Sequence, residues 1–137
     1  MREMSFLDEV LQSAARFHGH LGPFLALGVR AGLRAIEVFG YRPFEMKAEI
    51  ATHMRTPYTC FVDGVQFVTG CTMGKGNIKL VDGAGIKAVF TVGSKRLELT
   101  VKEEALEKAK NAGERSEEVA LKIMRGSLEE LFEEKLI

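Results

Sequence analysis

Three short segments between residues 77 and 101 alternate apolar and polar residues and are separated only by turn sequences. They are Asn77–Val81, Ile86–Val92 and Arg96–Val101, with glycine in both intervening turns. Side chains of a strand alternate between its two faces, so this pattern predicts three consecutive strands. Strands that follow one another without an intervening helix exclude a repeating sheet of βαβ units and indicate an α+β fold.

Helical and strand patterns fill the rest of the chain. The expected elements are a helix from the Ser5 cap to His18, a helix from Pro23 to Gly40, a strand at 46–53, a helix at 59–70 and two helices within 102–137. Gly28 and Gly32 lie one turn apart in the second helix, which favours close packing against a neighbour. No linker or repeat interrupts the order, so we expect one domain, 1–137, with a four-stranded sheet.

The charges of the chain balance, with 19 Lys and Arg against 19 Asp and Glu. A nucleic-acid-binding surface normally leaves a basic excess, so we expect no nucleic-acid partner. The balance is uneven along the chain, because residues 102–137 carry 7 basic and 10 acidic residues and the remainder carries 12 and 9. The acidic end would therefore attract the rest of the chain, within one molecule or between two.

The number of cysteines and the lengths of the apolar runs indicate the cellular compartment of the protein. Cys60 and Cys71 are too few for a disulfide-framed secreted domain. No apolar run reaches the ~20 residues of a membrane-spanning helix. The first six residues lack the apolar core of a signal peptide. We therefore expect a cytoplasmic protein with reduced thiols and no membrane contact.

Two histidines flank a glycine in the segment 17–23. His18 and His20 cannot share one face of a helix, but Gly19 can break the helix and let both rings turn toward one point. They would then form part of a metal site beside the helix that Pro23 opens. The alternative is one hydrogen-bonded core histidine and one histidine in solvent.

Cys60 is expected in the first turn of its helix, where free N–H groups and the helix dipole favour a thiolate. Asp63, one turn later, would orient a ligand or move a proton. This pair supports either a metal ligand with a neighbouring carboxylate or a nucleophilic cysteine that needs no metal. The alternative is a buried structural cysteine and a surface carboxylate.

The glycine-rich segment 70–77 does not match the spacing of a phosphate-binding P-loop. Its N–H groups would either cradle an anion or form a tight turn before the next strand. His53, at the end of the first strand, is either a reserve metal ligand or a histidine without a role.

Three segments together resemble one family, that of the E subunit of formylmethanofuran dehydrogenase. Residues 17–23, Phe-His-Gly-His-Leu-Gly-Pro, resemble its His-Gly-His-x-Cys-Pro-Gly motif. Cys60, Asp63 and Gln66 resemble its central cysteine helix, and residues 69–77 resemble its Gly-Cys-Thr-x-Gly-Lys-Gly-Asn loop. The likeness runs from about 18 to 101, so we divide the domain into a family core, 1–101, and acidic C-terminal helices, 102–137, outside it.

The resemblance implies an α-β-α-β-β-β core with a mixed four-stranded sheet, similar to the catalytic domain of glyceraldehyde-3-phosphate dehydrogenase. It also implies homodimers and a metal site for which His18, His20 and Cys60 are the matched ligands. Asp63 joins Cys60 as a candidate catalytic residue, and Lys75 is the candidate for cofactor binding.

Two departures from the family pattern bear on these expectations. Gly22 replaces the motif cysteine, which removes one soft ligand or leaves an open coordination position. The Cys-x-x-Cys zinc ribbon of some members does not occur in these 137 residues, so the chain resembles a short form.

Two functions are consistent with these features. The first is a cytoplasmic metal-binding protein that holds a divalent ion, zinc before others, at a His/His/Cys site with an open position for a small substrate. The second is a non-catalytic accessory subunit or binding module of a larger molybdenum or tungsten enzyme of C1 metabolism.

Overall fold

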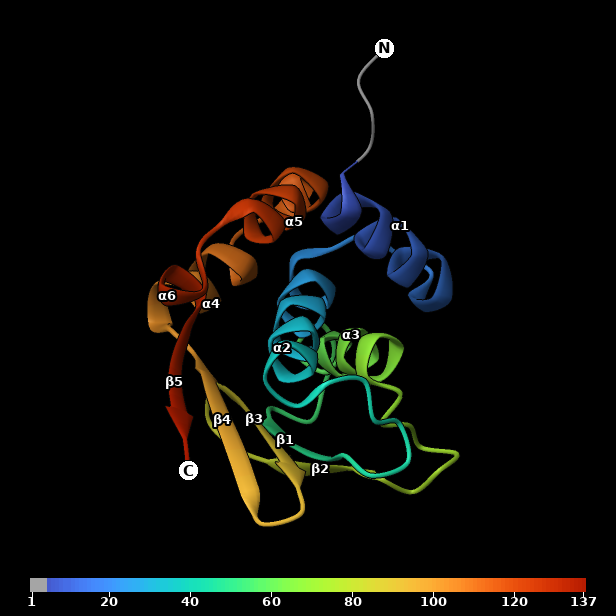
Figure 1. Cartoon of the computed structure of the whole chain (residues 1–137). Coiled ribbons are helices and arrows are strands. Elements are labelled where there is room, and N and C mark those ends of the chain that lie inside the picture. The colour runs from blue at the N-terminus through green and yellow to red at the C-terminus, as the bar shows by residue number, and fades with distance from the viewer. Residues whose placement is uncertain (1–4) are drawn as a thin grey trace.

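The computed structural model describes residues 5–137, and the expectation of no signal peptide falls mostly on residues outside that range. Figure 1 shows the helices gathered above a sheet. The elements are α1 (Phe6–His18), α2 (Pro23–Phe39), β1 (Lys47–Thr52), α3 (Cys60–Thr69), β2 (Ile78–Asp82), β3 (Ile86–Val92), β4 (Lys95–Val101), α4 (Glu103–Lys110), the 3₁₀ turn η1 (Gly113–Arg115), α5 (Ser116–Arg125), α6 (Leu128–Leu131) and β5 (Phe132–Leu136). This order confirms the α+β class.

The sheet is mixed and has five strands in the order β2-β1-β3-β4-β5. The β1–β2 pair is parallel, with α3 as the crossover between the two strands, and the other three pairs are antiparallel. A mixed sheet was expected, but the expected number of four strands was wrong. The fifth strand comes from the C-terminal segment, where only helices were expected.

Tertiary contact explains the fifth strand. Without β5, the outer edge of β4 would present unpaired backbone groups beside the buried side chains of Leu97 and Leu99. Phe132 is buried opposite Val101 and starts the strand, although the acidic residues that follow favour a helix. The split of the preceding segment into two helices near residues 111–113 is confirmed.

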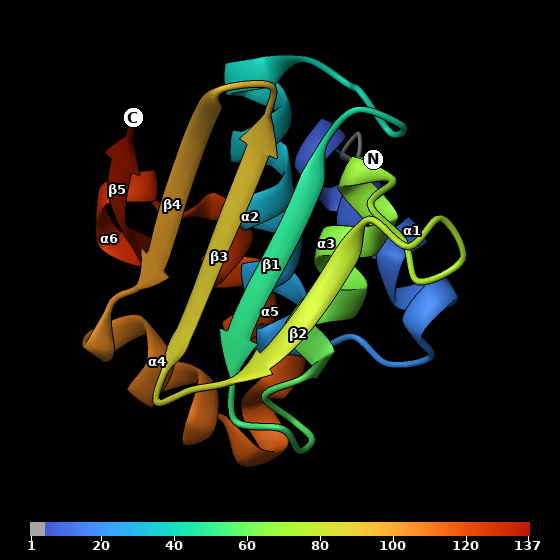
Figure 2. The same cartoon turned by 90° about the horizontal axis from the view of Figure 1, so that it is seen from below.

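One face of the sheet carries the helices and the core. Figure 2 views the sheet from its other face, with α2, α3 and α5 behind the strands. Along β1, Ala48, Ile50 and Thr52 are buried toward the helices, whereas Lys47 and Glu49 point away and are exposed. The same alternation along β3 and β4 gives a half-buried, largely polar outer face.

The turn between α1 and α2 forms as its glycines and proline predict. The Ser5 hydroxyl accepts the Asp8 N–H, which confirms the N-cap of α1. Gly19 ends α1 with φ +98°, in the left-handed region that suits glycine. Pro23 occupies the first turn of α2, where its missing N–H leaves no donor unpaired.

Helices α2 and α3 touch backbone to backbone through glycine. A Cβ atom on Gly28 would lie 2.0 Å from the backbone oxygen of Phe61. From the other side, a Cβ on Gly64 would lie 2.5 Å from the backbone oxygen of Leu25. The close-packing role expected of Gly28 is confirmed, and this contact sets where α3 and its polar side chains lie.

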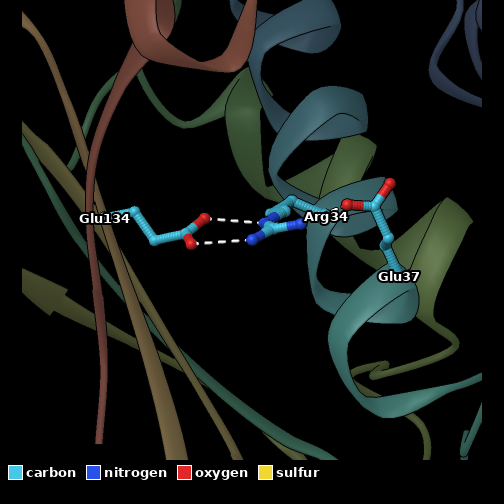
Figure 3. Close-up of polar contacts among 3 residues, drawn as sticks. All are labelled: Arg34, Glu37 and Glu134. Atoms are coloured by element: carbon cyan, nitrogen blue, oxygen red, sulfur yellow. Dashed lines mark hydrogen bonds and ion pairs between the residues drawn. The ribbon is translucent and has the colours of Figure 1, made fainter.

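Arginines of α2 connect the first half of the chain to its C-terminal elements. The Arg30 guanidinium donates to the backbone oxygens of Ile123, Met124 and Gly126 at the end of α5. Arg34 donates two hydrogen bonds to the Glu134 carboxylate on β5, 2.7 and 2.8 Å long (Figure 3). The attraction between the basic and acidic parts of the chain therefore operates within one molecule.

Over residues 5–137, none of the helices combines the length and the apolar character needed to cross a bilayer.

Candidate functional site

A small pocket brings together three of the residues singled out from the sequence. His18, Cys60 and Asp63 line a cavity of about 300 Å³. Its other lining residues are Thr56, Thr59, Val62, Gln66, Met73, Ile78 and Leu80. The pocket thus lies between the end of α1, the first two turns of α3 and the edge strand β2. Its volume is at the low end of ligand cavities, which span roughly 300–1,000 Å³.

His18 and Asp63 form the central contact of the pocket. The His18 Nδ1 and the Asp63 Oδ2 are 2.5 Å apart, although 45 residues separate them in the chain. The His18 side chain is 14% exposed and the Asp63 side chain 37%. Because Nδ1 is engaged, Nε2 on the opposite side of the ring faces away from Asp63. A carboxylate that fixes a histidine in this way is typical of metal-ligating histidines and of catalytic bases.

Cys60 is the first residue of α3 and is half-buried. Burial raises the pKa of its thiol, the negative charge of Asp63 raises it further, and a backbone hydrogen bond opposes both. Burial and the charge of Asp63 thus act against the thiolate that the helix N-terminus was expected to favour. A cation in the pocket would reverse this balance, because it favours the charged sulfur.

His20 lies apart from the pocket. It is exposed and does not line the cavity. Its ring instead lies against Gly22, where an added Cβ would be 3.0 Å from both Nδ1 and Cε1. The position at which the family motif has cysteine is therefore next to the His20 ring.

Gln66 connects the pocket carboxylate to the glycine-rich loop. Its amide nitrogen lies 3.5 Å from Asp63 Oδ1, and its amide oxygen accepts the Met73 N–H at 2.9 Å. The sequence motif included Gln66 but predicted no role for it. The spacing of Cys60, Asp63 and Gln66, three residues apart each time, places them along one face of a helix and was the available signal.

The glycine-rich loop is a tight turn and not an anion cradle. The backbone N–H groups of Thr72, Met73, Lys75 and Gly76 are all bonded within the protein. The Asn77 side chain holds the loop, because it accepts from Thr72 and donates to two backbone oxygens of the loop at 43–46. Lys75 is exposed, and its ammonium lies 5.5 Å from the Phe44 ring centre, outside the pocket lining.

The remaining histidine and cysteine lie elsewhere. The His53 ring packs on Tyr58 with ring centres 4.9 Å apart. Cys71 is a free, fully buried thiol whose sulfur donates to the Met46 backbone oxygen. Neither residue lines the pocket, so both serve as internal controls for experiments on it.

Of the three expected metal ligands, His18 and Cys60 line the pocket and His20 does not. Within residues 5–137, no group of three or more His, Cys, Asp or Glu side chains is arranged to hold a metal ion. The imidazole of His18 and the thiol of Cys60 nevertheless line one cavity beside an oriented carboxylate. This arrangement suits proton transfer, or two-point ligation of a cation.

A larger open groove of about 1160 Å³ lies between α4, α5 and α6. It is lined by charges of both signs, among them Lys108, Arg115 and Glu130, over an apolar floor that includes Ile123 and Leu131. Its lining contains no histidine or cysteine. We therefore place the candidate chemistry in the smaller pocket.

Comparison with known proteins finds relatives in sequence and in structure. A probable S-adenosyl-L-methionine-binding protein of Archaeoglobus fulgidus is 39% identical over 80 residues. That match covers 57% of this chain but only 22% of the relative's length. A crystal structure of an FmdE-like protein from Syntrophus aciditrophicus, described as similar to the E subunit of a tungsten formylmethanofuran dehydrogenase, superposes with a TM-score of 0.64 at 18% identity. It covers the whole of this chain and 77% of that one, so the two share a fold.

A family model described as "FmdE, Molybdenum formylmethanofuran dehydrogenase operon" matches residues 17–136. The match includes the histidine motif, the central helix and the glycine-rich loop. It also extends through α6 and β5, so the expectation that residues 102–137 lie outside the family was wrong. The chain belongs to the FmdE family.

Proposed function

We propose that this FmdE-family protein binds a divalent metal ion, zinc before others, in the pocket between α1 and α3. His18 would bind through Nε2 and Cys60 through its sulfur, and Asp63 would hold the imidazole in the required tautomer. The observation that carries the proposal is the 2.5 Å contact between His18 and Asp63 beside Cys60. Imidazole and thiolate are ligands that zinc prefers.

The third expected ligand, His20, would have to turn from Gly22 toward the pocket. The residue is exposed and follows Gly19, whose backbone tolerates a wide range of conformations. His18 and Cys60 would thus be the first two protein ligands, and His20 would join them through a rotation of the segment 19–22. The remaining position would be left for a small substrate.

The pocket residues would have different roles in binding the metal and a substrate. A zinc ion bound there would act as a Lewis acid on a substrate that reaches the open position. Asp63 would accept a hydrogen bond from the His18 Nδ1–H throughout and so keep the ring oriented. Val62, Met73, Ile78 and Leu80 provide the apolar part of the lining.

The test measures zinc bound per chain and the zinc dissociation constant, by elemental analysis and competition with a chromophoric chelator, on protein purified without an affinity tag. We expect about one zinc per chain, and its loss in His18→Ala and Cys60→Ser. His53→Ala and Cys71→Ser are the matched controls, because both residues lie outside the pocket. Gly22→Cys adds a soft donor beside His20 and should tighten binding.

Two results would contradict the proposal. One is a protein that takes up no zinc at micromolar concentrations. The other is a stoichiometry that falls as much in His53→Ala and Cys71→Ser as in the pocket variants.

A second candidate function is a binding module or accessory subunit without chemistry of its own. One observation favours it: the matched segment makes up 22% of the Archaeoglobus fulgidus relative, so a unit of this kind occurs inside a longer polypeptide. The family description also refers to the operon of a molybdenum enzyme. In this role the chain would bind a larger C1 enzyme, or a ligand such as S-adenosyl-L-methionine, which the relative's name mentions.

Calorimetric titration with S-adenosyl-L-methionine and co-purification with a formylmethanofuran dehydrogenase distinguish this candidate from the first. Binding of either one by protein stripped of zinc would support a module. No binding of either one, together with stoichiometric zinc in the pocket, would exclude the module in favour of the metal site.

A further inference from the structure

Within residues 5–137, strand β5 pairs with β4 along one edge and has no neighbouring strand along the other. Arg96 and Ile137 exchange both backbone hydrogen bonds, and the ladder continues to the Lys102 N–H, which donates to the Leu131 oxygen. In an antiparallel ladder, hydrogen-bonded pairs alternate with pairs that direct their N–H and C=O groups outward. Phe132, Glu134 and Leu136 are the outward-directed residues, because they fall between the bonded positions.

We propose that two copies of this chain join through their β5 strands, antiparallel and centred on Glu134, to form one continuous ten-stranded sheet. The sequence of β5, Phe-Glu-Glu-Lys-Leu, is complementary to itself in this register. Phe132 would face Leu136 of the second copy, and Glu133 would face Lys135. The occupant of this edge is therefore a second copy, and the proposal goes beyond the metal site.

The backbone groups available at the edge match this pairing. The Phe132 N–H is already bonded to the Leu128 oxygen, so it needs no partner. Glu134 would exchange two hydrogen bonds with its symmetry mate. Each Leu136 N–H would donate to a Phe132 oxygen across the interface. The free donors of Glu134 and Leu136 would thus all be satisfied, and such edges are the usual templates for strand addition.

The side chains agree with the pairing on both faces of the sheet. Glu133 and Lys135 lie on the outer face, where each would form an opposite-charge cross-strand pair with the second copy. On the helix face, Leu136 is 55% exposed although its partner on β4, Leu97, is fully buried. The added strand of the second copy would lie beside Leu136 and reduce this exposure.

The two Glu134 side chains at the symmetry axis would repel each other if they were free. Each one instead receives two hydrogen bonds from Arg34 of its own chain, which also pairs with Glu37 (Figure 3). The guanidinium directs the carboxylate toward α2 and offsets its charge. The hydrogen bonds from Arg34 therefore reduce the repulsion between the two Glu134 carboxylates at the centre of the interface.

The interface lies at the opposite edge of the sheet from the candidate pocket. β5 and β2 are the two edge strands, and Ile78 and Leu80 of β2 line the pocket. Dimerisation through β5 would leave both pockets open at the two ends of the extended sheet. A failure of the dimer and a failure of the metal site are therefore independent results.

Charge reversal tests the register with the full-length chain. Glu133→Lys and Lys135→Glu each turn two attractive cross-strand pairs per dimer into two repulsive ones, so we expect each to raise the dissociation constant of the dimer about tenfold. Sedimentation equilibrium measures the constants, and thermal unfolding of each variant checks the fold, because Lys135 also lies opposite Glu98 on β4. Glu114→Lys, on the exposed η1 turn, is the matched control and should leave dimerisation unchanged.

Mixing the two variants provides a sharper test. The Glu133→Lys chain presents two lysines, and the Lys135→Glu chain presents two glutamates. Together they should form a heterodimer about as tight as the unmodified homodimer. Amide exchange in the unmodified protein should also show the Glu134 and Leu136 N–H groups becoming protected as concentration rises.

Three results would overturn the proposal. The first is an unmodified chain that stays monomeric at several hundred micromolar. The second is a dimer whose constant does not respond to either reversal. The third is a mixture in which the two variants fail to associate, because then the dimer uses another surface.

Discussion

The His18 imidazole has one nitrogen engaged by Asp63, so the position and tautomer of the ring depend on that carboxylate. We expect Asp63→Ala to weaken zinc binding about ten- to a hundredfold, because loss of a group that orients a ligand usually costs that much. Asp63→Asn should lose less, since its amide oxygen still accepts a hydrogen bond from the Nδ1–H. Competition titration with a chromophoric chelator measures both, and equal losses in the two variants would contradict an orienting role.

The Cys60 thiol gives a prediction about pH in the metal-free protein. Burial and then the charge of Asp63 raise its pKa, so the reactive thiolate should appear only above the ordinary range for a thiol, about 8.5. The alkylation rate against pH measures this in a Cys71→Ser background. Asp63→Asn removes the negative charge and should move the midpoint to lower pH. A midpoint well below 8 in the unmodified pocket would instead indicate an activated nucleophile.

The helix pair α2–α3 depends on glycine at its point of closest approach. Gly28→Ala would place a methyl group 2.0 Å from the Phe61 backbone oxygen, and a backbone atom cannot rotate away. We expect a loss of roughly 3 kcal/mol in the free energy of unfolding by urea, at the upper end for overpacking.

Gly32→Ala is the matched control for this substitution. Its Cβ would lie 3.0 Å from Val68 Cβ, a contact that a movement of a few tenths of an ångström between the helices relieves, and alanine favours the helix by up to ~1 kcal/mol. Equal losses for Gly28→Ala and Gly32→Ala would mean that the backbone contact is not the cause.

Helices and strands that are defined by their own sequence pattern could be predicted, and those that form only through contacts with distant parts of the chain could not. The bounds of β3 were predicted at Ile86–Val92 and found there, because alternation and flanking glycines define them locally. β5 was missed, because its acidic residues favour a helix and only the edge of β4 makes them a strand. In the pocket, Cys60 and Asp63 share one helix face by spacing alone. Their meeting with His18 depends on how α1 packs on α3, and His20 was expected to join them.

At the scale of the whole molecule, the acidic C-terminal segment is part of the same core as the motif-bearing part. Ala120 and Met124 of α5 are fully buried. Arg30 of α2 binds the last backbone oxygens of α5, and β5 extends the sheet beyond β4. A division at residue 101 would therefore cut through a single hydrophobic core and expose the edge of a central sheet.

A chain that ends at Val101 should consequently lose cooperative unfolding. It would leave Leu97, Leu99 and the α2 face uncovered, and it would leave the half-buried Arg30 guanidinium without its three acceptors. Circular dichroism during heating and the dispersion of amide signals measure the effect. A chain that ends at Leu131 keeps α4 to α6 and lacks only β5, so its melting temperature should fall while the transition stays cooperative. If the 1–101 chain melted cooperatively within a few degrees of the full chain, the core would not need α5, and the helices from 102 onward would be an appendage.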